Sequence, residues 1–513
     1  MSTAAVVKNA RFVGQEHQGC DAMLIEGGKI RALAKTSDID ALSGGTCEVI
    51  DMAGAFIVPG FIDTHTHFLH TGLHMTMVSL VAAKSIDEMI TILREEEGET
   101  AEWKKGFGFD ESLFSEGRRP TRHDLDKAEA TRPLVIFRRD YHSCVVNTAA
   151  LKSLSLPEAI ASHAVSEGIF AGKANDWIRQ VLSKSTGDRE RREACMKAAA
   201  LALSRGVTTV HALEGGSLFT TEDLEFFIEG GLPLGPRVVL YPQITDIRWV
   251  KERGLPRIGG CLLVDGSFGS WTAALSEPYQ DRADTAGILY FDDGALFSFV
   301  ERAHSEGLQI SLHAIGDRAI RQAVDAYERA LARHPAADHR HRIEHCELPS
   351  VSDIERIAKL GIALGVQPAF ESLWGGEGKM YHRRLGLRRM RRTNPLRELQ
   401  EAGIVMGGGS DSDVTPLDPF LGIEAAATHP TKPSRLTVSE GLELYTGNAA
   451  FLSRGEGSPG RLAEGMAADF TVLSMNPLQT PGGELGRIRI LKTFVGGECL
   501  FEGADTPGAK NIR

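Results

Sequence analysis

The sequence predicts an α/β fold: a (β/α)8 TIM barrel with an inserted α/β subdomain and a small β-sandwich built from both chain ends. Three observations predict it. Strand-like and helical patterns alternate along most of the chain, one long gap interrupts that alternation, and hairpin patterns lie near both ends. The chain has 513 residues, a length that one barrel with attachments fills.

Short strand-like runs lie near both ends of the chain, and two of them contain a Gly-Gly turn. These runs are residues 4–13, 21–34, 469–473 and 491–502. Glycine pairs supply the positive φ angles that a two-residue hairpin turn needs. We therefore expect residues 1–57 and 455–513 to form one composite β-sandwich domain.

Eight strand-like runs suited to a parallel sheet occur between these ends, within residues 58–454. They are residues 61–67, 208–212, 237–241, 261–265, 309–313, 342–345, 363–367 and 405–410. Helical patterns separate several of them, for example at 295–306 and 319–333, and this alternation favours a parallel barrel. The first gap, at about 70–205, is too long for one crossover helix. It is expected to hold an inserted α/β subdomain.

The composition is typical of a soluble globular enzyme. Hydrophobic residues make up 42% and charged residues 24% of the chain, and no apolar run approaches the ~20 residues of a membrane span. The net charge of −11 opposes binding to a nucleic-acid backbone. The seven scattered cysteines predict reduced thiols. With no secretory pattern at the start, we expect a cytoplasmic protein with a small-molecule substrate, no nucleic-acid or membrane partner, and a homo-oligomer as one option.

Residue types that bind metals stand at or after the ends of several predicted strands. His65 and His67 close the first strand, and they share one face because side chains repeat every two residues. The others are a segment with Cys261 and Asp265, then His313, His345 and Asp411. Because the carboxyl ends of parallel barrel strands meet at one mouth, this series predicts a metal centre there.

Six ordered motifs give the chain a family resemblance. They are PGFIDTHTHF at 59–68, VDGSFGS at 264–270, LHAIGD at 312–317, RIEHCE at 342–347, GSDSDVTPLDP at 409–419 and LYTGNAA at 444–450. With these motifs the chain resembles the amidohydrolase superfamily (amidohydrolase family 3), and within it the YtcJ-like branch that includes N-substituted formamide deformylases. The resemblance covers almost the whole chain.

The resemblance implies zinc or another divalent metal, with one or two ions per chain. His65 and His67 would hold the more buried ion and His313 and His345 the more exposed one, while Asp411 would reach the first ion and the attacking water. The implied reaction is hydrolysis of a non-peptide C–N bond, in an amide or N-substituted formamide of a small molecule. Metal-bound hydroxide would attack the carbonyl carbon, and Asp411 would move the proton to the leaving nitrogen. Two alternatives stay open: a deaminase of an amino-substituted ring, and a metal-binding relative without catalysis.

Cys261 departs from the pattern of binuclear relatives. In those relatives a carboxylated lysine at this position bridges both ions. A thiolate is a good zinc ligand and can bridge two ions without that modification. Two interpretations follow: a binuclear centre bridged by Cys261, or a mononuclear site beside a buried free cysteine.

Two of the ligand assignments have structural alternatives. His345 could be a core histidine paired with Glu344, and Asp411 could cap a helix, since Ser-Asp-Ser-Asp is good capping chemistry. Asp413 and Asp418 are interpreted as structural.

Three further residues are candidates for substrate binding. His142 lies in the insertion, where relatives more often read Asp-Gly-His and this chain has Tyr141. His211 ends the second strand and could instead orient a ligand or simply pack. Trp271 lies in the loop after the fourth strand, where it could form an apolar wall or pack beneath the loop. An arginine cluster at 383–392 is either a solvated face or a patch for an acidic substrate or partner subunit.

Overall fold

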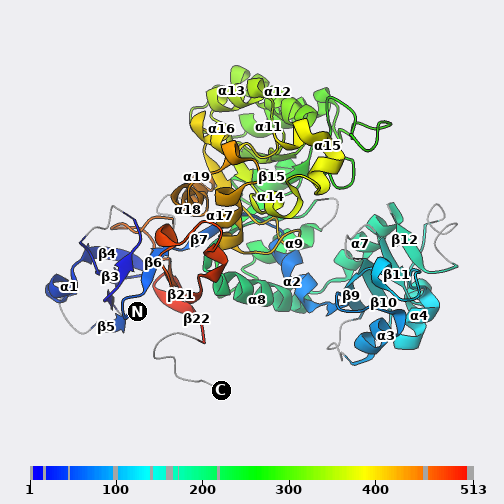
Figure 1. Ribbon diagram of the computed structural model, residues 1–513, viewed down its shortest axis with the longest axis horizontal. Coiled ribbons are helices and arrows are strands. Elements are labelled where there is room, and N and C mark those ends of the chain that lie inside the picture. Colours follow the sequence, from blue (N-terminus) through cyan, green and yellow to red (C-terminus); the bar gives the residue numbers. More distant parts are fainter. Residues whose placement is uncertain are drawn as a thin grey trace. The chain divides into compact units, whose positions relative to one another are not determined.

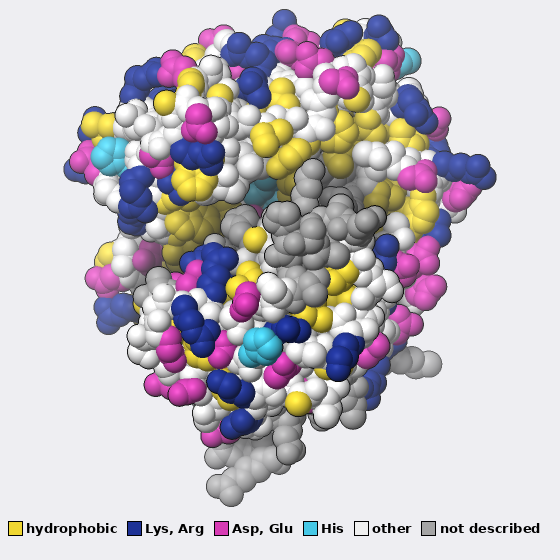
Figure 2. Space-filling view, turned by 90° about the vertical axis from the view of Figure 1, so that its right-hand side faces the viewer, with side chains coloured by type: hydrophobic (Ala, Val, Ile, Leu, Met, Phe, Trp, Pro, Cys, Tyr) yellow, Lys and Arg dark blue, Asp and Glu magenta, His cyan; other side chains and the backbone are white. Residues whose placement is uncertain are grey.

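The computed structural model describes residues 4–14, 19–43, 47–95, 102–138, 143–157, 166–171, 173–216, 220–454 and 460–504. The predicted substrate-binding residue His142 lies outside these ranges. The chain divides into two compact units: Met1–Phe68 with Ala199–Glu214 and Pro233–Arg513, and Leu69–Ala198 with Gly215–Leu232. No helix in the described ranges has the length and apolar character of a membrane span. On the face drawn in Figure 2, basic side chains are interspersed with acidic ones.

The first unit contains eight parallel strands close to their predicted positions. They are β7 (Phe61–Thr66), β13 (Val207–Glu214), β14 (Arg237–Pro242), β15 (Arg257–Leu263), β16 (Gln309–Ala314), β17 (Arg342–His345), β18 (Ala363–Val366) and β19 (Met406–Gly408). Parallel ladders join them into one sheet of order β14-β13-β7 and another of order β15-β16-β17-β18-β19. The predicted α/β class is confirmed.

The hydrogen-bonded ladders do not close the predicted barrel within the described residues. At one seam, Thr66 of β7 forms an isolated parallel bridge with Ser412, just after β19. At the other seam, between β14 and β15, no ladder joins the described residues, and the backbone of β15 is irregular: its pairing with its other neighbour, β16, shifts register between Ile258 and Leu262. Gly260 has φ 52° there, and a Cβ on it would lie 2.7 Å from Tyr241 O of β14. The two strands therefore touch, but the irregular backbone of β15 interrupts regular pairing.

Amphipathic helices follow many of these strands and appear around them in Figure 1. In α12 the buried residues include Ile320, Val324 and Tyr327, which form one apolar stripe at helical spacing. The predicted helices at 295–306 and 319–333 are confirmed as α11 and α12. The helices of this unit are α10 (Ile247–Glu252), α11 (Asp293–Ser305), α12 (Asp317–Arg333), α13 (Val351–Leu360), α14 (Ala369–Trp374), α15 (Met380–Met390), α16 (Leu396–Glu401), α17 (Pro419–Thr428), α18 (Val438–Leu444) and α19 (Gly447–Leu452).

Two further sheets lie near the chain ends: the N-terminal residues form the first alone, and both ends contribute to the second, so that blue β6 and red β21 lie near each other in Figure 1. The first has order β4-β3-β1-β5: Lys29–Ala34, Ala22–Glu26, Ala5–Lys8 and Glu48–Asp51. The second has order β2-β6-β20-β21-β22: Arg11–Phe12, Phe56–Pro59, Phe470–Leu473, Ile490–Val495 and Glu498–Glu502. Helix α1 (Thr36–Ser43) follows β4. One hydrophobic cluster includes Val7 and Met23 from one sheet with Phe470 and Phe494 from the other.

The second unit is built on a five-stranded sheet of order β12-β11-β10-β9-β8. Along β10, Leu134 and Ile136 join one hydrophobic cluster, while Val135 and Phe137 join another, as alternation on a strand requires. The predicted insertion at about 70–205 overlaps this unit. Its strands are β8 (Val78–Ser79), β9 (Lys104–Phe109), β10 (Leu134–Arg138), β11 (Ser143–Val146) and β12 (Ile169–Ala171), and its helices are α3 (Ile86–Glu95), α4 (Arg122–Ala128), α5 (Thr148–Ser153), α7 (Lys173–Ser185) and α9 (Thr221–Ile228). The chain passes between the units four times: within α2 (Phe68–Thr76), within α8 (Asp188–Ser204), after Glu214 and before Pro233.

Two histidines just before β17, His339 and His341, are held as neutral tautomers. Ile310 N donates to His341 Nδ1 at 3.0 Å, and His341 N donates to His339 Nδ1 at 2.9 Å. In the neutral rings the other nitrogens carry the hydrogens, so His341 Nε2 donates to His304 Nδ1 at 2.9 Å and His304 Nε2 donates to His334 O at 2.6 Å. Protonating His339 or His341 at Nδ1 would place a ring N–H against the backbone N–H that this nitrogen accepts from.

The free energy of unfolding should fall as the pH drops below about 6.5. Burial, reinforced by His339 and His304, lowers the pKa of His341 well below its ordinary value. The unfolded chain therefore binds more protons than the folded chain in that range, which lowers stability by about 1.4 kcal/mol per pH unit for His341. The change in the free energy of unfolding is measured by urea unfolding of wild type and His341→Gln at about pH 7.5 and about pH 5.5. The variant should lose part of the pH dependence, whereas His334→Gln, whose ring is half exposed, should keep it. Equal pH dependence in wild type and His341→Gln would show that His341 does not contribute.

Candidate metal centre

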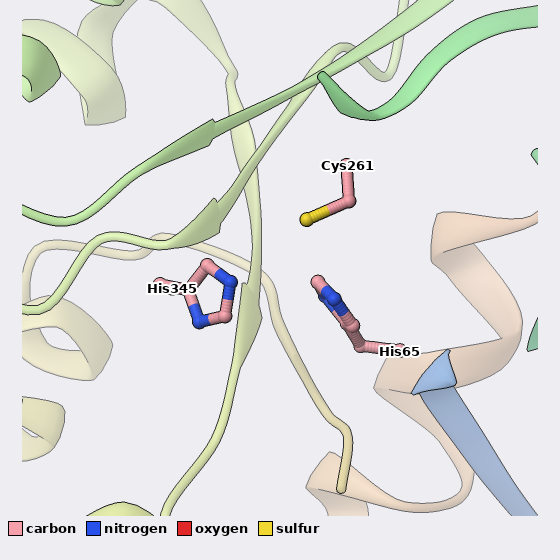
Figure 3. A group of neighbouring side chains, drawn as sticks. All are labelled: His65, Cys261 and His345. Atoms are coloured by element: carbon pink, nitrogen blue, oxygen red, sulfur yellow. The ribbon is translucent and has the colours of Figure 1, made fainter. Parts of the chain in front are cut away.

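Six predicted ligands come together at the carboxyl ends of the parallel strands. His65, His67 and Asp411 form one group, and His65, Cys261 and His345 form another; within each group the candidate ligand atoms all lie within 4.8 Å of one another. Figure 3 shows the second group, with its three side chains directed toward one another. The sixth, His313, reaches this group through its Nδ1, which lies 3.5 Å from Cys261 Sγ. His65 belongs to both groups.

The two histidines at the end of β7, His65 in the strand and His67 just after it, are oriented through their Nδ1 atoms. His67 Nδ1 donates to Leu213 O at 2.9 Å, and His65 Nδ1 donates to Glu344 Oε2 at 2.7 Å. In a neutral ring each Nε2 is then a bare acceptor. Both Nε2 atoms nevertheless face Asp411 Oδ1, at 3.3 Å from His65 and 3.4 Å from His67. Burial lowers the pKa of both rings, but Asp411 raises it well above the usual value, so without a metal both nitrogens hold protons toward the carboxylate. A divalent cation in place of those protons would be bound by the same three atoms, so this residue set suits a metal.

Backbone geometry turns the later ligands toward the same place. His345 and Asp411 have φ of 69° and 53°, a left-handed conformation that non-glycine residues adopt at a cost and that is frequent at functional sites. Asp411 N also donates to His65 O at 2.8 Å. On β15, the irregular stretch at Gly259 and Gly260 immediately precedes Cys261.

The charges of the group are mutually stabilising. Burial alone would raise the pKa of the Cys261 thiol, but His313 and His65 hold it well below its usual value. Burial would likewise raise the pKa of Asp411, which His65 and His67 hold well below its usual range. Burial would lower the pKa of His313, yet Cys261 and Asp265 raise it to about 9. A thiolate and a carboxylate among four imidazoles form a strong site for a divalent cation.

The alternative interpretation of His345, a core histidine paired with Glu344, is wrong about that pair. Glu344 hydrogen-bonds His65, the ligand on β7, whereas His345 Nδ1 is buried without a hydrogen-bond partner among the described residues. Adjacent strand residues face opposite sides, which explains why Glu344 does not pair with its neighbour. The orphaned nitrogen is further support for His345 as a ligand.

The capping alternative for Asp411 is also wrong. Helix α17 begins at Pro419, and its cap is Asp418, whose carboxylate accepts from Phe420 N at 3.0 Å. Asp418 also pairs with Arg205 at 3.0 Å. The structural interpretation of Asp418 is therefore correct.

His211 lies behind the ligands, not at the surface. Its side chain is fully buried, and its Nδ1 accepts from Arg342 Nη1 at 3.0 Å. Burial and Arg342 lower its pKa well below the usual value, so it is neutral. This placement favours the orienting role over direct contact with substrate.

Trp271 lies in the loop after β15 and is held on two sides. Its Nε1 donates to Asp281 Oδ1 at 3.0 Å, and the guanidinium carbon of Arg384 lies 3.7 Å from its ring centroid. It packs against a hydrophobic cluster that contains Phe370, whose ring centroid is 5.8 Å from that of His345. A role in substrate binding stays a prediction.

Two buried residues near the ligands were not predicted from the sequence. Arg342 and Glu344 lie two positions apart on β17, and both side chains are fully buried. The available signal was their alternation on a strand that ends in a ligand histidine. A buried Arg-x-Glu pattern on such a strand indicates an ion pair behind the ligands.

Comparisons with known proteins agree with this geometry. The model of an amidohydrolase family matches residues 48–501. A putative amidohydrolase of Bacillus subtilis (strain 168), YtcJ, is 30% identical over 522 residues, covering 95% of this chain and 97% of that protein. An N-substituted formamide deformylase of Arthrobacter pascens is 25% identical, covering 96% and 97%. The crystal structure of an uncharacterized metal-dependent hydrolase from Pyrococcus furiosus is 29% identical with a TM-score of 0.80, covering 93% of this chain and 100% of that one. The chain therefore belongs to the amidohydrolase family.

Proposed function

We propose that this protein is a metal-dependent hydrolase that cleaves a non-peptide C–N bond in an amide or N-substituted formamide of a small molecule. The observation that carries the proposal is the convergence of two histidine Nε2 atoms on one carboxylate oxygen of Asp411, at 3.3 and 3.4 Å. We further propose that the eight parallel strands wrap into a (β/α)8 barrel, with a β-sandwich formed by the chain ends.

The proposed ligands divide into two sets that share the space around Cys261. His65, His67 and Asp411 would hold one ion, and His313 and His345 a second, with the Cys261 thiolate between them. The chemistry that such ions supply is activation of water and polarisation of a carbonyl group. Zinc suits the mixture of imidazole, thiolate and carboxylate donors.

Asp411 is the proposed proton carrier. Its carboxylate accepts a proton from the attacking water and returns it to the leaving nitrogen, so that the C–N bond breaks to a neutral amine. Its side chain is 9% exposed and that of His67 is 13% exposed, whereas His65 is fully buried. Substrate therefore approaches from the side of Asp411 and His67.

The surroundings of the site support a substrate with an apolar substituent. Phe370 stacks near His345, and Trp374 lies 4.7 Å from Phe370 between ring centroids. Trp271, Trp374 and Met380 pack against the same cluster and remain partly exposed. One relative is an N-substituted formamide deformylase, and a bulky N-substituent suits such a surface.

The arginine cluster at 383–392 supports an uncharged substrate. Arg384 is bonded to Asp281 and stacks on Trp271, Arg388 pairs with Glu277 at 2.7 Å, and Arg392 pairs with Glu398 at 2.6 Å. Arg389 donates to Glu277 O and Pro278 O at 3.0 and 2.8 Å. Several of these arginines thus join α15 to the long loop after β15, which favours a structural role over recognition of a substrate carboxylate.

Substitution of Asp411 tests the proposed chemistry. Asp411→Asn should retain its metal and lose about 10²–10⁴-fold in kcat because it can no longer accept a proton. The measurement is turnover of a panel of N-substituted formamides, amides and amino-substituted rings, with metal content determined on the same samples. Asp418→Asn is the matched control, since asparagine also caps a helix and its turnover should be unchanged. A loss below about tenfold in metal-loaded Asp411→Asn would refute the role. Wild-type turnover of the rings alone would favour the deaminase.

Elemental analysis tests the position of Cys261 between two ions. Wild type should contain two equivalents of divalent metal, and Cys261→Ala should contain one or none, because the bridging thiolate is lost. Cys346→Ala is the control: it removes another buried thiol, one outside both ligand groups. One equivalent in wild type and Cys261→Ala alike would identify a mononuclear centre.

Arg384→Ala tests the role of the arginine cluster. Loss of the contacts to Asp281 and Trp271 should loosen the loop after β15 and lower kcat/KM by similar factors for a neutral amide and for its carboxylate-bearing analogue. The exposed Arg391→Ala is the control and should change neither value. A selective rise in KM for the carboxylate analogue would instead assign Arg384 to substrate recognition.

A further inference from the structure

Behind the metal centre lies a buried ion pair that the proposed chemistry does not use. Arg342 Nε donates to Glu344 Oε1 at 2.5 Å, and Arg342 Nη2 donates to Glu344 Oε2 at 2.8 Å. Ser311 Oγ also donates to Glu344 Oε1. Burying two charges is costly, and an apolar pair of similar size often gives equal or greater stability. Stability alone therefore does not explain this pair.

The pair makes contact with the metal centre through β7. Glu344 Oε2 accepts from His65 Nδ1 at 2.7 Å, and Arg342 Nη2 also donates to Thr64 O, the residue before His65, at 2.8 Å. The remaining Nη1 donates to His211 Nδ1 on β13. The N–H donors of the planar guanidinium have fixed directions, and they bond a carboxylate, a main-chain carbonyl and a neutral imidazole at the same time.

The neighbouring strand leaves room for this arrangement. Gly365 of β18 stands beside the pair, and a Cβ on it would lie 2.3 Å from Glu344 Oε2 and 2.7 Å from Arg342 Nη2. A side chain at this position would displace the charged groups. The space for the ion pair is therefore built by two strands.

We propose that Arg342 and Glu344 are positioning residues for the metal centre. Glu344 fixes the tautomer and rotation of the His65 ring, and Arg342 fixes both Glu344 and the backbone that carries His65. Because His65 belongs to both ligand groups, its orientation affects every ion bound there. A carboxylate behind a ligand histidine also raises the basicity of the ligating nitrogen. This inference rests on the proposed function and adds that metal affinity depends on residues that touch no metal.

The test is metal affinity of the full chain, measured by competition between the apoprotein and a chromophoric chelator for Zn²⁺. Glu344→Gln and Arg342→Lys should each weaken binding by about 10–100-fold. Substitution with Co²⁺ gives a second readout, because a rotated His65 changes the visible absorption spectrum. The control is Asp223→Asn, which alters another buried ion pair, Arg191 with Asp223 at 2.8 Å, in the other compact unit and outside the ligand groups. It should lower the thermal midpoint and leave affinity and spectrum unchanged.

A double variant separates positioning from folding. Arg342→Met with Glu344→Leu removes both charges together, so it should fold yet show the same loss of affinity. Wild-type affinity and spectrum in the double variant, or in Glu344→Gln, would overturn the inference. If wild type binds Zn²⁺ but hydrolyses no amide or formamide, the proposed function is refuted. The comparison of metal affinities then still decides whether Arg342 and Glu344 position the metal centre. Wild type that binds no divalent metal would overturn both.

Discussion

The metal centre depends on the contact between the end of β7 and the segment that follows β19. Asp411 N donates to His65 O and His67 N donates to Ser412 O, each at 2.8 Å. These two bonds place the two candidate histidine ligands at the end of β7 beside the candidate carboxylate ligand. Gly409 permits the approach, since a Cβ there would lie 2.6 Å from the Cβ of His65. A larger residue would separate the strands and the ligands with them.

A second close contact that requires glycine lies on β15, just before Cys261. Gly259 and Gly260 have φ of 98° and 52°, and a Cβ on Gly259 would lie 2.2 Å from Ser311 O. The same irregularity that interrupts pairing between β14 and β15 therefore precedes Cys261. Regular pairing at this seam would require a different backbone at Gly260.

Local patterns in the sequence were sufficient to predict the eight strands and the candidate ligand types that the structure brings together at their ends. Strand periodicity and the position of His65, His67, His345 and Asp411 require no knowledge of distant contacts. Predicting which side chain each of these residues contacts does require knowledge of distant contacts. Glu344 pairs with His65, which is 279 positions away, and no local pattern distinguishes that partner from the adjacent His345. For the same reason the arginine cluster could be recognised as basic but not assigned its partners on the loop after β15.

The residues around the candidate metal centre differ in burial, and this difference matches their proposed roles. Arg342, Glu344 and His65 have no exposed side-chain surface, so water cannot replace a lost hydrogen bond there and each contact has to be made by the protein. Asp411 and His67 retain some exposure and can exchange protons and water with the substrate side. Ligand orientation is thus fixed where the dielectric is low and hydrogen bonds are strong. Asp411, the proposed proton carrier, lies where some of its surface is exposed.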